Sequence, residues 1–255
     1  MRSLSDKVVI VTGGSKGMGR HFVDALSEQG AKVACFARPS TEQSAVRALN
    51  NPDILAVDCD VSSSSQADAA MAQTLAHFGH LDALVNNAGF FSPFLIENAE
   101  DRAVEQHVSV NLLGPIWLTR AAIPHLRSSQ GQIVSVSSES VRMPFPYLSV
   151  YAATKAALET FGAAMRDELR EYGIRVTTLR SGSVSGSTGN QNWDPKVAQE
   201  FMETIMRTGH AQFSGAPSTP ESMAEALVSV LSLPVDINID LIEVRSAAAG
   251  TPGPS

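Results

Sequence analysis

The chain is poor in cysteine and has no long apolar run. Its two cysteines, Cys35 and Cys59, lie in apolar segments of strand length, which predicts buried thiols in a reducing compartment instead of a disulfide scaffold. No apolar stretch reaches the length that spans a bilayer. The first residues lead into a predicted strand without the pattern of a signal peptide. We therefore expect a cytoplasmic protein with no membrane partner.

Basic patches and metal-ligand patterns are also lacking. The formal net charge is −7 and lysine and arginine form no run, which argues against nucleic acid or an anionic membrane as a partner. The six histidines are scattered without the spacing of a metal site, so we expect no catalytic metal. The hydrophobic content of 44% is ordinary for a globular protein, and 255 residues suit one large α/β domain or two small ones.

Apolar runs of strand length alternate with helical patterns along the chain. Most of the runs are apolar on both faces, which is typical of a buried parallel sheet. The alternation predicts an α/β fold, doubly wound and Rossmann-like, with about seven parallel strands and helices on both faces. The predicted strands are Val8–Thr12, Val33–Ala37, Ile54–Asp58, Ala83–Asn86, Ile133–Ser137, Arg175–Leu179 and Leu241–Val244. No linker marks a second domain, so we expect one domain over 1–246 and a flexible tail over 247–255.

A glycine-rich segment follows the first predicted strand and precedes a helical pattern. Glycines let the backbone approach a pyrophosphate closely, and the N–H groups at a helix N-terminus favour phosphate. The spacing is Gly-x-x-x-Gly-x-Gly. The segment therefore predicts a dinucleotide-binding turn, whose candidate residues are Gly13, Ser15, Lys16, Gly17, Met18 and Gly19.

A tyrosine and a lysine stand four residues apart in a later helical segment. They are Tyr151 and Lys155, and Ser138 lies thirteen residues upstream of the tyrosine. Residues at i and i+4 share a helix face, so an ammonium group is expected beside the phenol. We expect this charge to lower the pKa of the tyrosine and to suit it for general acid/base chemistry. Taken alone, the pair also fits an ordinary helix, and the serine an ordinary strand-end cap.

Together and in this order, the motifs resemble the short-chain dehydrogenase/reductase family in its compact single-domain form. Further matching positions are Asp60-Val61, Asn86-Asn87-Ala88-Gly89 and Asn111. The resemblance implies four catalytic residues, Asn111, Ser138, Tyr151 and Lys155. It also implies cofactor contacts from Asp60, Val61, Asn87, Ala88, Gly89, Tyr151 and Lys155.

The resemblance assigns a role to each catalytic residue. Tyr151 exchanges a proton with the substrate, and Ser138 orients the substrate oxygen. Lys155 holds the nicotinamide ribose and tunes the tyrosine, while Asn111 supports a proton-relay water. Asn111 has apolar neighbours, and asparagine is a mediocre helix former, so its place in a predicted helix needs a reason.

The choice of nicotinamide cofactor depends on the end of the second predicted strand. NAD-binding relatives carry an acidic residue there, which falls on Ala37 in this chain, and the next residue is Arg38. A guanidinium group suits bidentate contact with a phosphate, and Lys16 is a second cation in the glycine turn. We therefore predict NADP(H), the alternative being that both cations are solvated surface charges.

The chain departs from the family pattern after the sixth predicted strand. The usual Pro-Gly is Ser181-Gly182 here, so the rigidity of the proline is lost. Gly182 and the backbone of Val184 are still expected to contact the nicotinamide. The usual threonine position falls on Gly186, and the candidates to replace it are Ser185, Ser187 and Thr188. The carboxyl-terminal segment Leu233–Val244 resembles that of NADP-preferring reductases.

We predict an NADP(H)-dependent dehydrogenase or reductase acting on a small-molecule alcohol or carbonyl. Residues 186–217 form a lid over the substrate in relatives, and the chain carries aromatic residues there and after the fourth and fifth strands. They favour a bulky apolar substrate, although the apolar helical face in this segment also fits simple packing. The resemblance implies a homotetramer or dimer.

Two other functions are open to the same fold. A non-catalytic NADP-binding regulator would have no need of the four catalytic residues together. An extended-type epimerase or dehydratase usually carries a larger substrate domain than this length allows.

Overall fold

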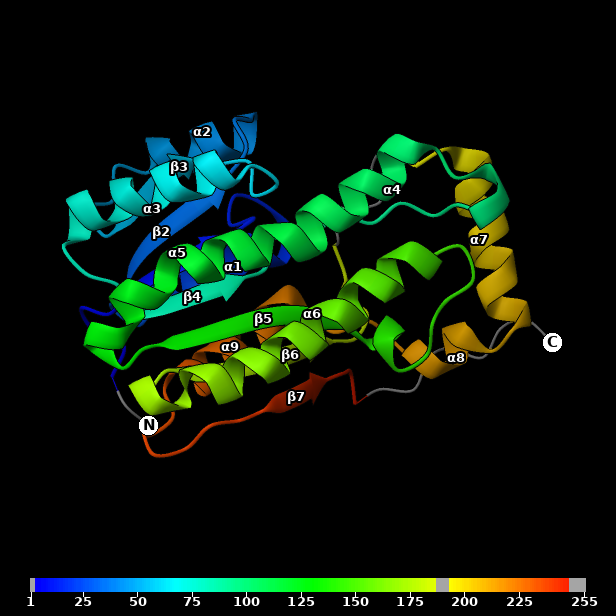
Figure 1. Cartoon of the computed structure of the whole chain (residues 1–255). Coiled ribbons are helices and arrows are strands. Elements are labelled where there is room, and N and C mark those ends of the chain that lie inside the picture. The colour runs from blue at the N-terminus through cyan, green and yellow to red at the C-terminus, as the bar shows by residue number, and fades with distance from the viewer. Residues whose placement is uncertain (1–2, 187–192, 248–255) are drawn as a thin grey trace.

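A seven-stranded parallel sheet organises the computed structural model, which describes residues 3–186 and 193–247. The strand order is β3-β2-β1-β4-β5-β6-β7, with helices on both sides (Figure 1). The predicted doubly wound parallel sheet is confirmed. The strands are β1 (Val8–Thr12), β2 (Lys32–Ala37), β3 (Ile54–Asp58), β4 (Ala83–Asn86), β5 (Gln132–Ser138), β6 (Arg175–Ser181) and β7 (Leu241–Val244).

Four of the strands have the predicted bounds, and the other three are slightly longer. Strand β2 starts one residue earlier, at Lys32, and β6 continues to Ser181. Strand β5 gains Gln132 and Ser138 at its two ends. The longer β5 and β6 matter because Ser138 pairs with Ser181 in the sheet, so the backbone of this candidate site residue is fixed by the sheet itself. Most of the predicted tail, residues 248–255, lies outside the described residues.

Helices connect the strands and cover the sheet. Their order is α1 (Gly17–Glu28), α2 (Thr41–Ala48), α3 (Ser64–Phe78), α4 (Asp101–Val108), α5 (Gly114–Ser129), α6 (Ser149–Leu169), α7 (Pro195–Arg207), α8 (His210–Ser214) and α9 (Pro220–Leu231). Three single-turn 3₁₀ segments are η1 (Ile96–Asn98), η3 (Glu139–Val141) and η4 (Arg170–Tyr172), and a π-helical segment, η2 (Ser109–Leu113), joins α4 to α5.

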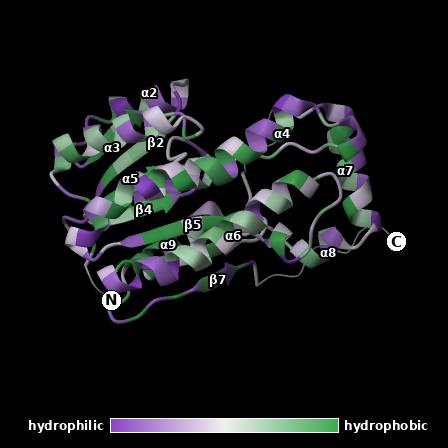
Figure 2. Ribbon diagram, in the orientation of Figure 1, coloured by the Kyte–Doolittle hydropathy of each residue, from purple (hydrophilic) through white to green (hydrophobic). Residues whose placement is uncertain are grey.

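Two apolar cores lie on opposite faces of the sheet. Alternate residues of each strand point to opposite faces, so Val9 and Val11 of β1 pack with α1 and α9, while Val8 and Ile10 pack with α3, α5 and α6. Figure 2 shows β4 and β5 as largely hydrophobic strands between helices of mixed character. Burial on both faces explains why the strands read as continuous apolar runs.

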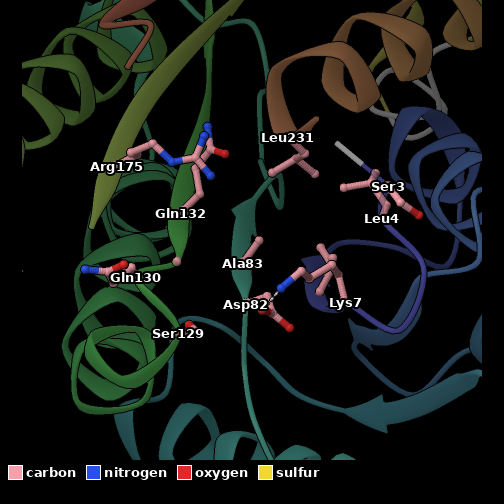
Figure 3. Close-up of a pocket in the computed structure, with 12 residues that line it drawn as sticks. Ser3, Leu4, Lys7, Asp82, Ala83, Ser129, Gln130, Gln132, Arg175 and Leu231 are labelled. Atoms are coloured by element: carbon pink, nitrogen blue, oxygen red, sulfur yellow. Dashed lines mark hydrogen bonds and ion pairs between the residues drawn. The ribbon is translucent and has the colours of Figure 1, made fainter. Parts of the chain in front are cut away.

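The amino-terminal edge of the sheet is closed by polar contacts and carries a small cavity of about 40 Å³ (Figure 3). Lys7 lies 2.8 Å from Asp82 there, and the Asp82 carboxylate also accepts the backbone N–H of Val8. Gln132 and Arg175 line the same cavity. Ligands of an open α/β sheet bind at the other edge, beyond the carboxyl ends of the strands. The cavity of Figure 3 is therefore separate from the site described below.

Both cysteines are buried and free, as predicted. Burial raises the pKa of the Cys35 thiol to about 12 and that of Cys59 to about 11. A protonated, buried thiol is a poor nucleophile, so neither cysteine is a candidate for covalent chemistry.

Candidate active site

The glycine-rich turn lies between β1 and α1, at the point where the order of the strands reverses. Gly13 and Gly17 have φ values of 63° and 52°, a region that favours glycine. A Cβ on Gly19 would collide with the Gly13 carbonyl oxygen, and one on Gly14 would lie 2.8 Å from the Cys35 Sγ. The turn is therefore packed so closely that only glycine fits, which leaves its outer backbone open to a ligand.

Thr12 and Asn87 lock the ends of β1 and β4 together at this point. The Thr12 Oγ1 accepts the N–H groups of Asn87 and Ala88, each at 2.9 Å. The Asn87 side chain donates to the Thr12 carbonyl at 2.8 Å. Thr12 was not among the predicted site residues. Its position between the first strand and the glycine-rich turn could have indicated that it belongs to the site. The lock fixes the segment Asn87–Gly89, where the resemblance places the cofactor.

Asp60 and Val61 shape the start of α3. The Asp60 carboxylate accepts the N–H of Ser62 at 3.0 Å and its hydroxyl at 2.7 Å. Ser63 caps the helix by accepting the Gln66 N–H. Val61 is buried, and a Cβ on Gly114 would lie 3.1 Å from its side chain. These contacts fix the segment after the carboxyl end of β3, on the same side of the sheet as the glycine-rich turn.

Lys16 and Arg38 are both exposed at this edge. Lys16 immediately precedes α1, and Arg38 follows β2. Neither makes an ion pair with any residue of the described ranges, 3–186 and 193–247. The lysine charge contributes to the lowered pKa of Glu42, behind hydrogen bonds to its own backbone and to Ser40. Two cations without partners are available to an anionic group in front of the turn.

The tyrosine and the lysine share a buried face of α6. Lys155 is buried, and its Nζ donates to the Val136 carbonyl at 2.8 Å and lies 5.9 Å from the centre of the Tyr151 ring. Burial lowers the pKa of Lys155 to about 8. Burial also raises the pKa of Tyr151, against a hydrogen bond from Ser138 that lowers it. The predicted lowering of the tyrosine pKa is therefore wrong for the protein alone, because burial, with a smaller contribution from the Glu139 charge, outweighs the hydrogen bond from Ser138.

Ser138 is the strand-end cap that the sequence left open, and its hydroxyl also lies beside Tyr151. Its side chain caps η3 by accepting the Ser140 N–H at 3.2 Å, and it interacts with Tyr151. Its neighbour Ser137 points elsewhere and donates to Glu159 at 2.7 Å. A strand-end cap in this position holds the serine hydroxyl beside the phenol.

The π-helical segment η2 explains the buried asparagine. Asn111 accepts the Phe90 N–H at 2.8 Å and donates to the Phe90 carbonyl at 2.8 Å. It also donates to the Thr154 hydroxyl at 3.2 Å, one residue before Lys155. Single-turn π segments inside helices often lie at functional sites. Gly89 closes the group, because a Cβ there would lie 3.7 Å from the Lys155 Nζ and 3.8 Å from the Asn111 Oδ1.

The loop after β6 is tied on both sides. The Gly182 N–H donates to the Val244 carbonyl at 2.9 Å, and Val184 forms a parallel bridge with Ser218. Ser185, one candidate for the missing threonine, donates through its backbone and hydroxyl to the Ser218 carbonyl. The other two candidates, Ser187 and Thr188, lie outside the described residues.

An aromatic cluster covers the phenol. The Phe91 ring lies 5.6 Å from Tyr151 and 5.2 Å from Trp193, and Trp193 lies 5.6 Å from Phe201 of α7. Phe201 and Ile205 are buried in this cluster, whereas Met202 and Met206 are exposed. The four residues therefore do not form one apolar face of α7, since the methionine pair points away from the cluster. The aromatic residues of this cluster therefore pack on the domain, and Phe91 also borders Tyr151.

Two further residues near Tyr151 went unassigned in the sequence. His107 is buried, with its Nδ1 2.7 Å from the Ala103 carbonyl, while its Nε2 accepts the Ser92 N–H. Burial lowers its pKa, so it is neutral at pH 7. Glu139 is buried directly after Ser138. Neither type of residue shows its burial in the sequence, because both are common on surfaces.

Comparisons with known proteins agree with this geometry. The family model described as short chain dehydrogenase matches residues 7–197, and the chain belongs to that family. It is 34% identical over 84% of its length to "11-beta-hydroxysteroid dehydrogenase-like 3" of Arabidopsis thaliana, of which it covers 71%. It is 32% identical over 89% of its length to "L-fucose dehydrogenase" of Mus musculus, of which it covers 83%.

Solved structures show the same fold with a bound cofactor. Serine dehydrogenase complexed with NADP+ superposes with a TM-score of 0.84 at 25% identity, over 97% of this chain and 98% of that one. A 3-ketoacyl-(acyl-carrier-protein) reductase from Brucella melitensis complexed with NADH gives 0.83 at 28% identity, over 96% and 99%. The protein is thus an oxidoreductase of a family that acts on CH–OH groups with a nicotinamide cofactor.

Within residues 3–186 and 193–247, no helix has the length and apolar character needed to cross a bilayer. The same part of the chain contains no cluster of three His, Cys, Asp or Glu side chains that could hold a metal ion.

Proposed function

We propose that the protein is an NADP(H)-dependent oxidoreductase that interconverts a bulky, mainly apolar secondary alcohol and its ketone. The observation that carries the proposal is the group formed by the buried Asn111 and Lys155 and the half-buried Ser138 and Tyr151 at the carboxyl ends of the strands. A regulatory protein that only bound the cofactor would have no need of all four residues together.

The residues of the turn fit a dinucleotide. The packing of Gly13, Gly14 and Gly19 leaves no room for side chains, and the N-terminus of α1 faces the same space with its N–H groups. Gly13, Ser15, Gly17, Met18 and Gly19 would hold the pyrophosphate. The edges of the site would be formed by Asp60, Val61, Asn87, Ala88, Gly89, Gly182 and Val184. When bound, the nicotinamide supplies the hydride donor or acceptor.

Ser138, Tyr151 and Lys155 have separate roles in the proposed reaction. Ser138 is placed to hold the substrate oxygen beside Tyr151, and the phenol gives a proton to that oxygen in reduction or takes one in oxidation. Because burial raises the pKa of Tyr151, the phenol is protonated at neutral pH, the form that reduction needs. Lys155 is placed to hold the nicotinamide ribose, and its charge favours the phenolate that forms as the proton leaves.

The preference for NADP(H) is supported by Arg38 and Lys16. An acidic side chain at this place would repel a 2′-phosphate, and Ala37 stands there instead. A guanidinium group can contact a phosphate with two parallel hydrogen bonds. Both cations are exposed and unpaired within the described ranges, so they can meet the phosphate without first breaking an ion pair.

An apolar substrate is supported by the aromatic rings around Tyr151. Phe91 packs against the phenol, Trp193 packs against Phe91, and Phe201 packs against Trp193. Phe90 and Phe94 pack on His107, 4.8 and 5.6 Å away. Ligand sites are usually lined by apolar and aromatic side chains with a few polar groups. A sugar or a small acid would leave these rings poorly matched.

The proposal is tested by measuring NADPH oxidation on ketones of rising apolar size, with the reverse reaction on the matching alcohols. We expect kcat/KM to rise with apolar size. Tyr151→Phe keeps the ring but removes the transferable proton, so kcat should fall about 10²–10⁴-fold. A folded Tyr151→Phe variant with near-wild-type turnover would show that the phenol is not the acid/base group. A preference for charged or polyhydroxylated substrates would overturn the substrate assignment.

The remaining assignments follow from the same proposal. We propose one catalytic domain over residues 1–246, with residues 186–217 acting as a substrate lid. We also propose that the protein works in the cytoplasm as a homotetramer or dimer, without nucleic acid or membrane as a partner.

A further inference from the structure

Glu139 is a buried carboxyl group that directly follows the catalytic serine. Its exposed fraction is 5%. The Ser214 hydroxyl of α8 donates a hydrogen bond to its Oε1. Its Oε2 lies 3.5 Å from the Arg245 Nε, yet no hydrogen-bond donor reaches that oxygen from the described part of the chain. Buried carboxylates are rarely kept without a reason, because desolvation destabilises them.

The surroundings of Glu139 come from three other segments of the chain. Besides Ser214 and Arg245, the Ser183 backbone N–H and the Glu243 carboxyl lie near enough to affect its pKa. Burial is the main effect and raises that pKa, Ser214, Arg245 and Ser183 lower it, and Glu243 raises it. The carboxyl group therefore lies where the segments after β5, β6 and β7 meet α8.

Arg245, which lies beside Glu139, contacts both helix α8 and the loop after β6. Its guanidinium group lies 4.3 Å from the centre of the Phe213 ring in α8. Its Cγ lies against Gly182, where an added Cβ would be 3.1 Å away. The preceding residue, Val244, accepts the Gly182 N–H at 2.9 Å. A single side chain thus touches both α8 and the loop proposed to face the nicotinamide.

The loop has a particular need for such contacts. Ser181 stands before Gly182, so no proline ring fixes the backbone φ there. A serine followed by glycine leaves the segment with more conformational freedom. Contacts from outside the loop must then hold it in place, and the Glu139–Arg245 pair lies beside it.

We propose that Glu139 and Arg245 are positioning residues that couple the placement of helix α8 to that of the loop Gly182–Val184, and both to Ser138. The coupling is a property of the protein without cofactor. Only its purpose, the ordering of the nicotinamide-facing loop when α8 is in place, rests on the proposed function.

Amide hydrogen exchange of the cofactor-free protein tests the coupling. The variants are Glu139→Gln, which keeps the shape and an acceptor for Ser214, Arg245→Lys, which keeps the charge, and the double variant. We expect both single variants to speed exchange in residues 182–186 and in 210–214 together. The double variant should exchange no faster than the faster single variant, because either change breaks the same link.

Arg142→Lys is the matched control. Arg142 also lies over the Phe213 ring, at 5.7 Å, and pairs with Glu243 at 3.3 Å, but it is exposed. No contact from it to the loop is found among the described residues. This variant should leave exchange in 182–186 unchanged. A response of only one segment in Glu139→Gln, or additive effects in the double variant, would overturn the coupling.

Cofactor titration and steady-state kinetics then test what the coupling serves. Glu139→Gln should raise the Kd for NADPH and lower kcat, each by roughly 3- to 30-fold, while KM for the ketone changes less. A purely structural residue would move the melting temperature without this pattern. Unchanged NADPH affinity and kcat with the exchange coupling intact would reject the role in catalysis. A wild-type protein with no NADPH affinity would reject the proposed function and leave the exchange result standing.

Discussion

At the residue scale, the site contains ionisable side chains whose charged forms are destabilised by burial. Lys155 has a pKa of about 8 in the folded protein, compared with an ordinary value of 10.5. Tyr151 and Glu139 shift upward for the same reason, because burial disfavours the charged form of each group. Functional sites commonly carry such unfavourable burial.

Lys155→Met should therefore stabilise the cofactor-free protein at pH 7. The folded lysine gives up its proton above pH 8, whereas the unfolded one keeps it until about pH 10.5. The unfolded state binds more protons in that range, so wild-type stability gains from rising pH. The difference in pKa corresponds to at most about 3 kcal/mol, reduced by about 1 kcal/mol for the lost hydrogen bond to Val136.

Chemical denaturation at pH 7 and pH 9 measures this effect. The advantage of Lys155→Met should be largest at pH 7 and should shrink at pH 9. Lys32→Met, which changes a much more exposed lysine, is the control and should show no such trend. A variant less stable than wild type at both values of pH would mean that the buried ammonium group is stabilised by its surroundings.

Arg38→Asp should reverse the cofactor preference. The new carboxylate would repel a 2′-phosphate and could accept hydrogen bonds from a ribose hydroxyl. We expect the Kd for NADPH to rise by about 10- to 100-fold, because a charge-assisted pair is replaced by a repulsion. The Kd for NADH should change little or fall. Arg170→Asp is the control, since Arg170 is exposed and follows α6 far from the turn.

Fluorescence titration of both nicotinamides decides the matter. Equal affinities of the wild-type protein for NADPH and NADH would contradict the NADP assignment, whatever the variant does. An unchanged ratio in Arg38→Asp would move the discrimination to Lys16, the other cation at this edge.

At the element scale, patterns that depend on close neighbours in the chain could be predicted and long-range contacts could not. The strands were predicted to within two residues, because burial on both faces leaves a continuous apolar run. The glycine turn was visible because its spacing reflects a local steric need. The contacts of Glu139 with Ser214 and Arg245 join positions far apart in the sequence, and no local pattern marks them.

The π-helical segment shows the same limit. The sequence predicts a helix around Asn111, and the chain runs as α4, η2 and α5 over this stretch. The insertion of a wider turn at Ser109–Leu113 depends on Asn111 bonding to Phe90 across the site. An asparagine with apolar neighbours was the one sign of it in the sequence.

Gly19→Ala should disable the turn while leaving the sheet intact. The new Cβ would collide with the Gly13 carbonyl oxygen and lie close to the Asn87 side chain. The turn must shift, and a shift of about 1 Å in such a site can reduce function about 100-fold. We expect a loss of cofactor affinity of that order with far-ultraviolet circular dichroism unchanged.

Gly162→Ala is the matched control for that change. Gly162 lies inside α6, and a Cβ there would be an ordinary 3.4 Å from the Thr178 Oγ1. Alanine is favoured over glycine inside a helix by about 0.5–1 kcal/mol, so this variant should bind cofactor normally and melt at the same or a higher temperature. Normal cofactor binding by Gly19→Ala would show that the turn does not contact the pyrophosphate.

At the scale of the whole molecule, the sheet ends in an unprotected edge. Strand β7 pairs with β6 on one side, and the described residues supply no strand for its other side. Leu241 of this strand is 42% exposed, and Val235 and Ile237 in the segment before it are 53% and 45% exposed. An exposed apolar edge strand favours pairing with another chain unless something covers it. The molecule therefore carries a surface suited to association with a second copy.

Sedimentation velocity at micromolar concentration should show a species heavier than the 27.0 kDa monomer. A two-fold contact along β7 would place Leu241 and Ile237 of both copies at one interface, because closed symmetric contacts use the same patch twice. Placing lysines there, as Ile237→Lys and Leu241→Lys together, should shift the protein toward the monomer, since the charges would be buried without partners. Ile96→Lys is the control, because Ile96 is 67% exposed and lies in η1, which follows the central strand β4 and is not part of the β7 edge. A wild-type monomer would contradict the proposed oligomer. An oligomer that survives both lysines would place the contact on other surfaces, of which the long helices α5 and α6 are the next to test.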